Sequence, residues 1–178
     1  AYQTGHFKLS SGLHSGNYIQ CSQLLKFPRV AEKVCSEIAA LFKDDNIEMV
    51  VGPAIGGILV AYEVGRALDV PAIFAERQDG KMTLRRGFHV EPGTRCLVTE
   101  DVLTTGGSAQ EVVELLQAQG AEVVSATSII DRTPGNTLKL KVPFKSLIQL
   151  TFPTYTEEEC PMCKEGQPIQ KPGSRPGI

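Results

Sequence analysis

Apolar positions recur with two different spacings along the middle of the chain. Three segments show the spacing of a helix with one buried face, and they cover residues 28–43, residues 57–68 and residues 108–119. In the first of them the expected inward positions are Val30, Val34, Ile38 and Leu41. Short apolar runs at residues 49–51, 71–75, 96–98 and 123–130 predict buried strands, and residues 144–150 predict one more.

The alternation of strands and helices predicts an α/β fold with a mainly parallel central sheet and helices on both faces. Residues 78–93 are polar and contain three glycines, which is typical of a long loop or a loose hairpin. Residues 1–5 look like the end of a helix or a turn. The tail from residue 153 is rich in proline, glycine and charge, so we expect an irregular cap or arm within a single domain of residues 1–178.

Composition excludes several classes of protein. The chain has 178 residues, of which 42% are hydrophobic and 21% charged, as in an ordinary soluble domain with one core. A net charge of −2 gives no general positive field for nucleic acid or an acidic membrane. No apolar run approaches the roughly 20 residues that span a bilayer, and no signal peptide opens the sequence. Five scattered cysteines indicate reduced thiols in a cytoplasmic protein.

The segment from Cys96 to Ser108 combines features that suit a sugar phosphate. Its apolar strand ends in the adjacent carboxylates Glu100 and Asp101, and threonines and glycines then lead into a helix. Glycines allow successive backbone N–H groups to point into one concavity, and the helix N-terminus adds the positive end of its dipole. The sequence therefore predicts an anion site that needs no lysine.

The acidic pair defines what else must bind there. Two carboxylates beside a phosphate site would repel the phosphate unless a neutral group lay between them. A ribose 5-phosphate meets this requirement, because its 2- and 3-hydroxyls can donate to Glu100 and Asp101 while its phosphate meets the amides. Neither G-x-x-x-x-G-K-[ST] nor G-x-G-x-x-G occurs, which disfavours the common nucleotide loops. Residues 106–108 alone would also fit an ordinary helix cap.

The acidic pair, the sequence Thr-Thr-Gly-Gly-Ser and the helix that follows resemble the segment of type I phosphoribosyltransferases that binds phosphoribosyl diphosphate (PRPP). The resemblance implies the fold of that family, with a small base-binding hood region at residues 1–25 and an irregular tail at residues 153–178. It implies PRPP contacts from Glu100, Asp101, Val102, Leu103, Thr104, Thr105, Gly106, Gly107, Ser108, Arg77 and Lys81.

Other segments resemble one branch of this family, the orotate phosphoribosyltransferases, which transfer ribose 5-phosphate to orotate in pyrimidine biosynthesis. These segments are residues 5–15, 52–57, 131–132 and, in some bacterial members, the tail at residues 160–166. The resemblance implies a diphosphate loop and an orotate site, formed respectively by Ala54, Ile55, Gly56 and Gly57, and by Thr104, Arg132, Ser10 and Ser11. The guanidinium of Arg132 offers a planar fork for the orotate carboxylate, although a surface ion pair with Asp131 is the ordinary alternative.

The same resemblance implies how the reaction is catalysed. In this family a mobile basic loop closes over the diphosphate, usually from the neighbouring subunit of a homodimer. Arg77 and Lys81 fit its pattern, whereas Thr83 stands where a histidine is expected and the diphosphate loop lacks a frequent lysine. The expected catalytic residues are Lys81, Glu100 and Asp101, with Lys81 stabilising the leaving diphosphate. The expected cofactor is Mg²⁺, held mainly through PRPP and water rather than directly by the protein.

Three alternatives stay open at this stage. A purine phosphoribosyltransferase would use the same sugar phosphate site, and a PRPP-sensing regulator would keep the fold without catalysis. Cys160 and Cys163 have the spacing of half a zinc site, but with no histidine near them in the sequence two spare thiols are the simpler interpretation. His6 and His14 are expected to have structural hydrogen-bonding roles, and Cys21, Cys35 and Cys96 are expected to be buried.

Overall fold

The structure is a computed structural model, and it describes residues 1–9, 11–133 and 138–172. The chain divides into two compact units. The smaller unit joins Ala1–Gln20 to Thr151–Ile178, and the larger unit is Cys21–Leu150. Residues 1–20 of the expected hood region therefore belong to one unit with the expected tail. Residues 21–25 of that region belong to the other unit, with the predicted strands and helices of the middle of the chain.

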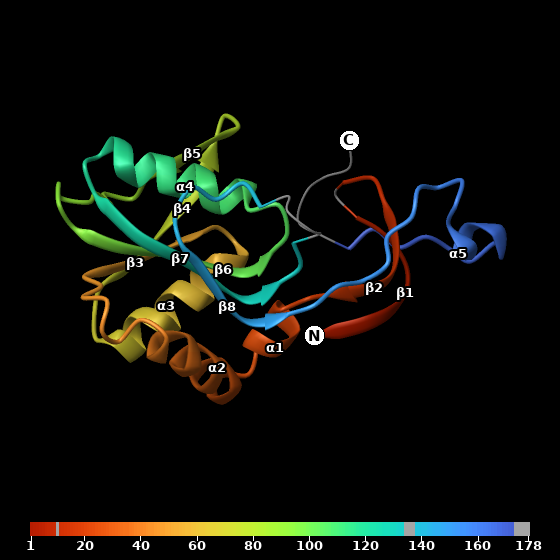
Figure 1. Ribbon diagram of the computed structural model, residues 1–178, viewed down its shortest axis with the longest axis horizontal. Helices are drawn as coiled ribbons and strands as arrows, with labels where there is room; N and C mark the ends of the chain where they lie inside the picture. Colours follow the sequence, from red (N-terminus) through yellow and green to blue (C-terminus); the bar gives the residue numbers. More distant parts are fainter. Residues whose placement is uncertain (10, 134–137, 173–178) are drawn as a thin grey trace. The chain divides into compact units, whose positions relative to one another are not determined.

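The larger unit is built on one sheet of six strands, in the order β5-β4-β3-β6-β7-β8 (Figure 1). Neighbouring strands are parallel throughout, except that β5 runs antiparallel to β4. This confirms the predicted mainly parallel sheet. The strands are β3 (Met49–Pro53), β4 (Ala72–Gln78), β5 (Lys81–Leu84), β6 (Arg95–Leu103), β7 (Glu122–Asp131) and β8 (Phe144–Gln149).

Helices cover both faces of this sheet, as predicted. Figure 1 shows α4 (Gly107–Ala118) on one face, and α2 (Pro28–Ala40) and α3 (Gly56–Leu68) on the other. A single turn of helix, α1 (Ser22–Leu25), precedes α2 and was not predicted. The inward face of α4 is the one expected from its spacing, because Ala109, Val112, Val113 and Leu116 are all buried.

The predicted inward face of α2 is wrong in part. Val30 and Leu41 are each 39% exposed, whereas the buried positions are Ala31, Cys35, Ile38 and Ala39. The two faces share only Ile38. The buried face consists mainly of small side chains, which allow close approach to the neighbouring helix and sheet. A prediction from hydrophobic spacing gives most weight to large apolar residues, and it therefore assigns the wrong face of α2 to the core.

For the polar segment at residues 78–93 the sequence predicts a long loop or a loose hairpin, and the structure contains a hairpin at its start. The strand β4 continues beyond its apolar run to Gln78, and a turn at Asp79 and Gly80 leads into β5. Arg77 pairs with Met82 and Gln78 with Lys81 across the hairpin. Two of the basic residues of interest therefore lie at the tip of a regular hairpin at the edge of the sheet.

The smaller unit contains an antiparallel hairpin of β1 (Tyr2–Lys8) and β2 (His14–Ile19). The prediction of a helix end or turn at residues 1–5 is therefore wrong. The tail supplies hydrogen bonds to both strands: Gln170 donates to His6 O at 2.8 Å, and His14 and Tyr155 exchange backbone bonds at 2.8 and 2.9 Å. Apart from the single-turn helix α5 (Pro161–Lys164), the described tail is irregular, as expected.

All five cysteines are free, and Cys21, Cys35 and Cys96 are buried as predicted. Burial raises the pKa of the thiols of Cys21 and Cys35 to about 12 and that of Cys96 to about 11. These three side chains therefore act as small apolar groups in the core. Among the described residues, no helix has the length and apolar character needed to cross a membrane. The cytoplasmic location stays a prediction.

Candidate active site

The carboxyl ends of the parallel strands meet at one edge of the sheet, which is where ligands of such sheets bind. Strand β6 brings Glu100 and Asp101 toward this edge, and residues 104–106 connect it to α4. In the register between β6 and β7, Leu103 lies opposite Asp131. The acidic pair, the glycine-rich loop and the end of β7 are therefore neighbours in the fold.

The loop that joins β6 to α4 has the form of an anion site. Between Thr104 and Ser108, no backbone N–H group donates to any residue in the described part of the chain. Gly106 is the N-cap of α4 and has φ 75°, a left-handed conformation that suits glycine. No side chain caps this helix. A run of unpartnered amides at a helix N-terminus is suited to a phosphate group.

A second segment supports the loop from the side. Lys139 N donates to Thr105 O at 3.0 Å, and Lys141 N donates to the Oε1 of Gln110 at 2.8 Å. A Cβ added to Gly106 would lie 3.1 Å from the side chain of Leu138. The stretch that leads into β8 thus binds a carbonyl group of the loop, while the amide groups of the loop stay available for a ligand.

The two carboxylates that precede the loop are partly buried. Burial, followed by the charge of Asp101, raises the pKa of Glu100 to about 8. Burial also raises the pKa of Asp101, although the N–H of Val102 donates to its Oδ1 at 2.9 Å and acts in the opposite direction. In the ligand-free protein the acidic pair therefore lacks enough donors to favour two negative charges. The hydroxyls of a ribose would supply such donors.

Replacing Glu100 with glutamine should raise the melting temperature of the ligand-free protein at about pH 9 and change it little at about pH 5. The pKa of Glu100 is raised to about 8 in the folded state, so the folded state disfavours the charged form. Wild-type stability therefore falls as the pH rises from the ordinary value of 4.5 toward 8, whereas glutamine stays neutral throughout.

Differential scanning fluorimetry across this pH range measures the effect. Glu158→Gln, at an exposed glutamate, is the matched control and should show no comparable dependence on pH. A change in melting temperature for Glu100→Gln that is the same at both ends of the range would contradict the raised pKa.

The predicted diphosphate loop lies directly against the acidic pair. A Cβ on Gly56 would come within 2.6 Å of the Oδ1 of Asp101, and a Cβ on Gly57 within 2.9 Å of Thr99 O. The backbone between β3 and α3 can approach β6 this closely only because these positions lack a side chain. The peptide bond between Ala54 and Ile55 is cis. The structure thus brings together two segments that the sequence indicated separately.

The basic residues of the β4–β5 hairpin differ in their partners. The guanidinium of Arg77 lies 2.7 Å from the carboxylate of Glu111 on α4 and also donates to Gly80 O at 2.9 Å. Lys81 is exposed, and its ammonium group forms no ion pair with any described residue. Arg86 forms two hydrogen bonds with Glu76, at 3.0 and 3.2 Å. Lys81 is therefore the cation of this hairpin that is available for a ligand.

The expected orotate residues are distributed over both units. The backbone N–H of Arg132 donates to Leu103 O at 2.8 Å, which places Arg132 beside Thr104 at the start of the loop. Ser11 lies in the turn of the β1–β2 hairpin, where its Oγ accepts from Leu13 N at 3.4 Å. Ser10 lies outside the described residues. The roles of all four residues stay predictions.

Sequence reasoning missed one group of side chains. His6, His14, Cys160 and Cys163 lie together in the smaller unit, with their ligand atoms within 4.8 Å of one another. The spacing of the two cysteines is typical of half a metal site. The sequence does not indicate the two histidines as ligands, because they come from the opposite end of the chain and only the fold places them beside the cysteines.

Comparison with known proteins gives the family. Residues 20–156 match the phosphoribosyl transferase domain, and the chain belongs to that family. Its relatives include orotate phosphoribosyltransferases from Caldanaerobacter subterraneus, 52% identical over 96% of this chain and 90% of that protein, and from Thermotoga maritima, 52% identical over 98% and 93%. The crystal structure of orotate phosphoribosyltransferase from Aeropyrum pernix aligns with a TM-score of 0.68 and 27% identity, over 84% of this chain and 88% of that one. Within the family, the chain is thus a member of the orotate phosphoribosyltransferases.

Proposed function

We propose that this protein transfers ribose 5-phosphate from PRPP to orotate, which gives orotidine 5′-monophosphate and diphosphate. The observation that carries the proposal is the pairing of free backbone amides at residues 104–108 with the acidic pair Glu100 and Asp101 on the same strand and loop. One end of this arrangement suits a phosphate and the other suits ribose hydroxyls.

The choice of base rests on relatedness and on charge. Relatives about half identical over almost the whole chain are orotate phosphoribosyltransferases. Orotate differs from the purine bases in carrying a carboxylate, and Arg132 stands beside the loop that would hold the ribose phosphate. A planar guanidinium can bind a carboxylate through two parallel hydrogen bonds, which a neutral purine base cannot match.

The chemistry needs no nucleophile from the protein. The base nitrogen attacks the anomeric carbon of PRPP as the bond to diphosphate breaks, so the ribose gains positive charge and the leaving group gains negative charge. The residues of this chain orient the two substrates and oppose these charges. Glu100 and Asp101 lie where they can stabilise a cationic ribose, and Lys81 is the proposed donor to the departing diphosphate.

Magnesium is part of the proposal. The two adjacent carboxylates at the end of β6 have the oxygen ligands that Mg²⁺ prefers, and Mg²⁺ usually keeps several waters and contacts substrate phosphates. Glu100 and Asp101 would hold the ion through water while PRPP supplies its direct ligands. The ion would neutralise the diphosphate when it is bound.

A homodimer is also proposed, with the β4–β5 hairpin reaching the neighbouring active site. Ile55, Leu59 and Tyr62 are 75%, 48% and 62% exposed, and their spacing places them on one face at the start of α3. Ile55 is itself in the proposed diphosphate loop. An apolar face beside the site supports a subunit interface there, which would bring the hairpin of one subunit near the site of its partner.

The proposed function is tested with purified protein, orotate, PRPP and Mg²⁺. We expect the ultraviolet absorbance of orotate to fall only when PRPP is present, with orotidine 5′-monophosphate as the product by chromatography. Adenine, guanine and hypoxanthine are assayed in parallel. Turnover of a purine base without turnover of orotate would replace the proposal with a purine phosphoribosyltransferase, and PRPP binding without turnover of any base would indicate a regulator.

Arg132→Ala should raise the KM for orotate about 10- to 100-fold and leave the KM for PRPP nearly unchanged, because a charge-assisted hydrogen bond contributes about 1.5–3 kcal/mol. Steady-state kinetics with each substrate varied in turn measure both constants. Arg132→Lys, which keeps the charge but not the planar fork, should recover only part of the loss. Equal losses for both substrates would remove Arg132 from the orotate site.

A further inference from the structure

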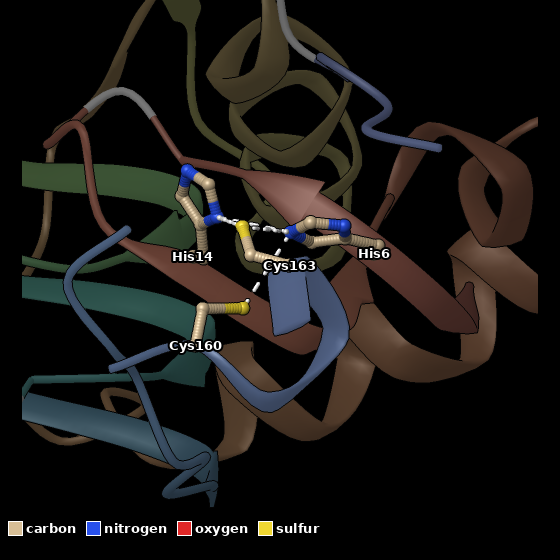
Figure 2. A group of neighbouring side chains, drawn as sticks. All are labelled: His6, His14, Cys160 and Cys163. Atoms are coloured by element: carbon tan, nitrogen blue, oxygen red, sulfur yellow. Dashed lines mark hydrogen bonds between the residues drawn. The ribbon is translucent and has the colours of Figure 1, made fainter. Parts of the chain in front are cut away.

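Four side chains that the proposed reaction does not use converge inside the smaller unit. His6 comes from β1 and His14 from β2, while Cys160 is the N-cap of α5 and Cys163 lies within its single turn (Figure 2). Each offers one atom that can bind a metal ion, and these four atoms all lie within 4.8 Å of one another. Two nitrogens and two sulfurs at this spacing are a donor set typical of structural zinc.

The separations between the atoms fit a single ion. In a tetrahedral site with Zn–N bonds of about 2.0–2.1 Å and Zn–S bonds of about 2.3 Å, neighbouring ligand atoms lie about 3.3–3.8 Å apart. Here His6 Nε2 lies 3.5 Å from Cys160 Sγ and 3.6 Å from Cys163 Sγ. His14 Nδ1 lies 3.2 Å from Cys163 Sγ and 2.9 Å from His6 Nε2. These four separations are within a few tenths of an ångström of the tetrahedral values, and all six separations are within 4.8 Å, so shifts of up to about 1 Å would seat the ion.

The other nitrogen of His6 fixes which atom faces the cluster. Its Nδ1 lies 2.9 Å from the backbone carbonyl oxygen of Gln167, which can only accept, so Nδ1 carries the proton. The Nε2 of the neutral ring therefore has a free lone pair that points at His14 and the cysteines. A hydrogen bond from the distal ring nitrogen to a backbone carbonyl is the usual support of a metal-binding histidine.

Hydrogen bonding within the cluster accounts poorly for the same arrangement. The single lone pair of His6 Nε2 is shared by three neighbours, namely His14 Nδ1 and the two sulfurs. Three of the four side chains are almost completely buried: His6 is 2% exposed, and His14 and Cys160 are 0% exposed. Buried polar groups normally each have their own partner, and one ion with four ligands provides that.

We propose that His6, His14, Cys160 and Cys163 bind one Zn²⁺ in a closed tetrahedral site. Four protein ligands leave no open position for water or substrate, so the site is structural rather than catalytic. The turn that presents the two sulfurs is already ordered by backbone bonds, since Lys164 N donates to Cys160 O at 3.2 Å and Gly166 N donates to Cys163 O at 3.0 Å.

The zinc ion would join the two ends of the chain. The ligands on the β1–β2 hairpin lie about 150 residues before those on α5, and the unit that they form is built from two short stretches, Ala1–Gln20 and Thr151–Ile178. Units of fewer than about 70–80 residues commonly need a metal or disulfides for stability. Binding that occurs only in the folded unit adds its free energy to folding.

Metal analysis of the full chain, expressed in zinc-supplemented medium, tests the proposal. We expect about one zinc ion per chain that survives a brief EDTA wash, because all four ligands come from the protein. Cys160→Ser should reduce the zinc content about tenfold or more, whereas Cys35→Ser, at an equally buried cysteine on α2, should leave it unchanged. Comparing Cys160→Ser with Cys35→Ser separates the loss of a zinc ligand from the loss of any buried thiol.

A second measurement applies even if the cysteine variant folds poorly. The wild-type protein loaded with Co²⁺ should show thiolate-to-cobalt charge transfer and the intense visible bands of a tetrahedral ion. A weak spectrum typical of six-coordinate cobalt would overturn the proposal. So would a zinc content below about 0.1 per chain after reconstitution with Zn²⁺, or a Cys160–Cys163 disulfide found by mass spectrometry of the native protein.

Discussion

Lys81→Ala is expected to lower the turnover number about 10²–10³-fold, or roughly 3–4 kcal/mol of transition-state stabilisation, with a smaller change in PRPP affinity. Lys81 lies at the tip of the β4–β5 hairpin, and its ammonium forms no ion pair with the described residues. It is therefore available to meet the negative charge that develops on the leaving diphosphate. Loss of one preorganised donor to a developing charge has effects of this size.

Arg85→Ala is the matched control for this prediction. Arg85 is an exposed cation on the same hairpin, but its guanidinium lies 3.9 Å from the carboxylate of Glu76. Its removal is expected to change turnover less than about fivefold, since surface ion pairs contribute little. Near-normal turnover in Lys81→Ala would show that Lys81 does not stabilise the leaving diphosphate. A similar loss in both variants would show a general effect of the positive charge of the hairpin.

Asp101→Asn is expected to lower kcat/KM for PRPP about 10²–10³-fold without loss of stability. The amide keeps the size of the carboxylate but loses its charge, which accepts from a ribose hydroxyl and opposes the positive charge of the ribose in the transition state. The pKa of Asp101 is raised by burial, so the folded protein gains nothing from that charge before PRPP binds. The melting temperature of the variant should equal or exceed that of the wild type at about pH 8.

Kinetics and thermal melting together decide what Asp101 does. Reduced kcat/KM with an undiminished melting temperature supports binding of the ribose. A fall in both would mean that the carboxylate holds the loop through its bond from Val102 and only indirectly affects catalysis. Unchanged kcat/KM would remove Asp101 from the site.

Mixing the two inactive variants tests whether a hairpin from the neighbouring subunit completes each site. If Lys81 serves the site of its partner, a mixed dimer of Lys81→Ala and Asp101→Asn contains one intact site. Random reassociation of equal amounts would then restore about a quarter of wild-type activity. No recovery, with subunit exchange verified by mass spectrometry, would place Lys81 in the site of its own subunit.

Much of the larger unit could be predicted because its signals are local. The strands β3, β4, β6 and β7 each contain a short apolar run. The acidic pair and the glycine-rich loop are adjacent in the sequence, so the position of the proposed anion site follows from one segment and from the rule that ligands bind at the carboxyl ends of strands. The face of α4 follows from helical spacing for the same reason.

What could not be predicted depends on contacts between distant parts of the chain. The small residues that α2 buries are selected by the helix and sheet beside it, and the closeness of Gly56 to Asp101 is set by the packing of β3 against β6. The β1–β2 hairpin receives hydrogen bonds from Gln170 and Tyr155, which its own sequence does not reveal. The histidines of the proposed zinc site share this problem, because nothing near them in the sequence indicates cysteines.

The pairing of the first strands with the tail has a consequence for synthesis of the protein. Chains emerge from the ribosome N-terminus first, and domains generally fold as units. The β1–β2 hairpin meets its partners at Tyr155, Cys160 and Gln170 only after the whole sheet of the larger unit has been translated. A chain truncated after residue 150 would thus carry a folded core preceded by an unfinished leading segment. Limited proteolysis of this truncated chain should cut within the first 20 residues and spare the sheet.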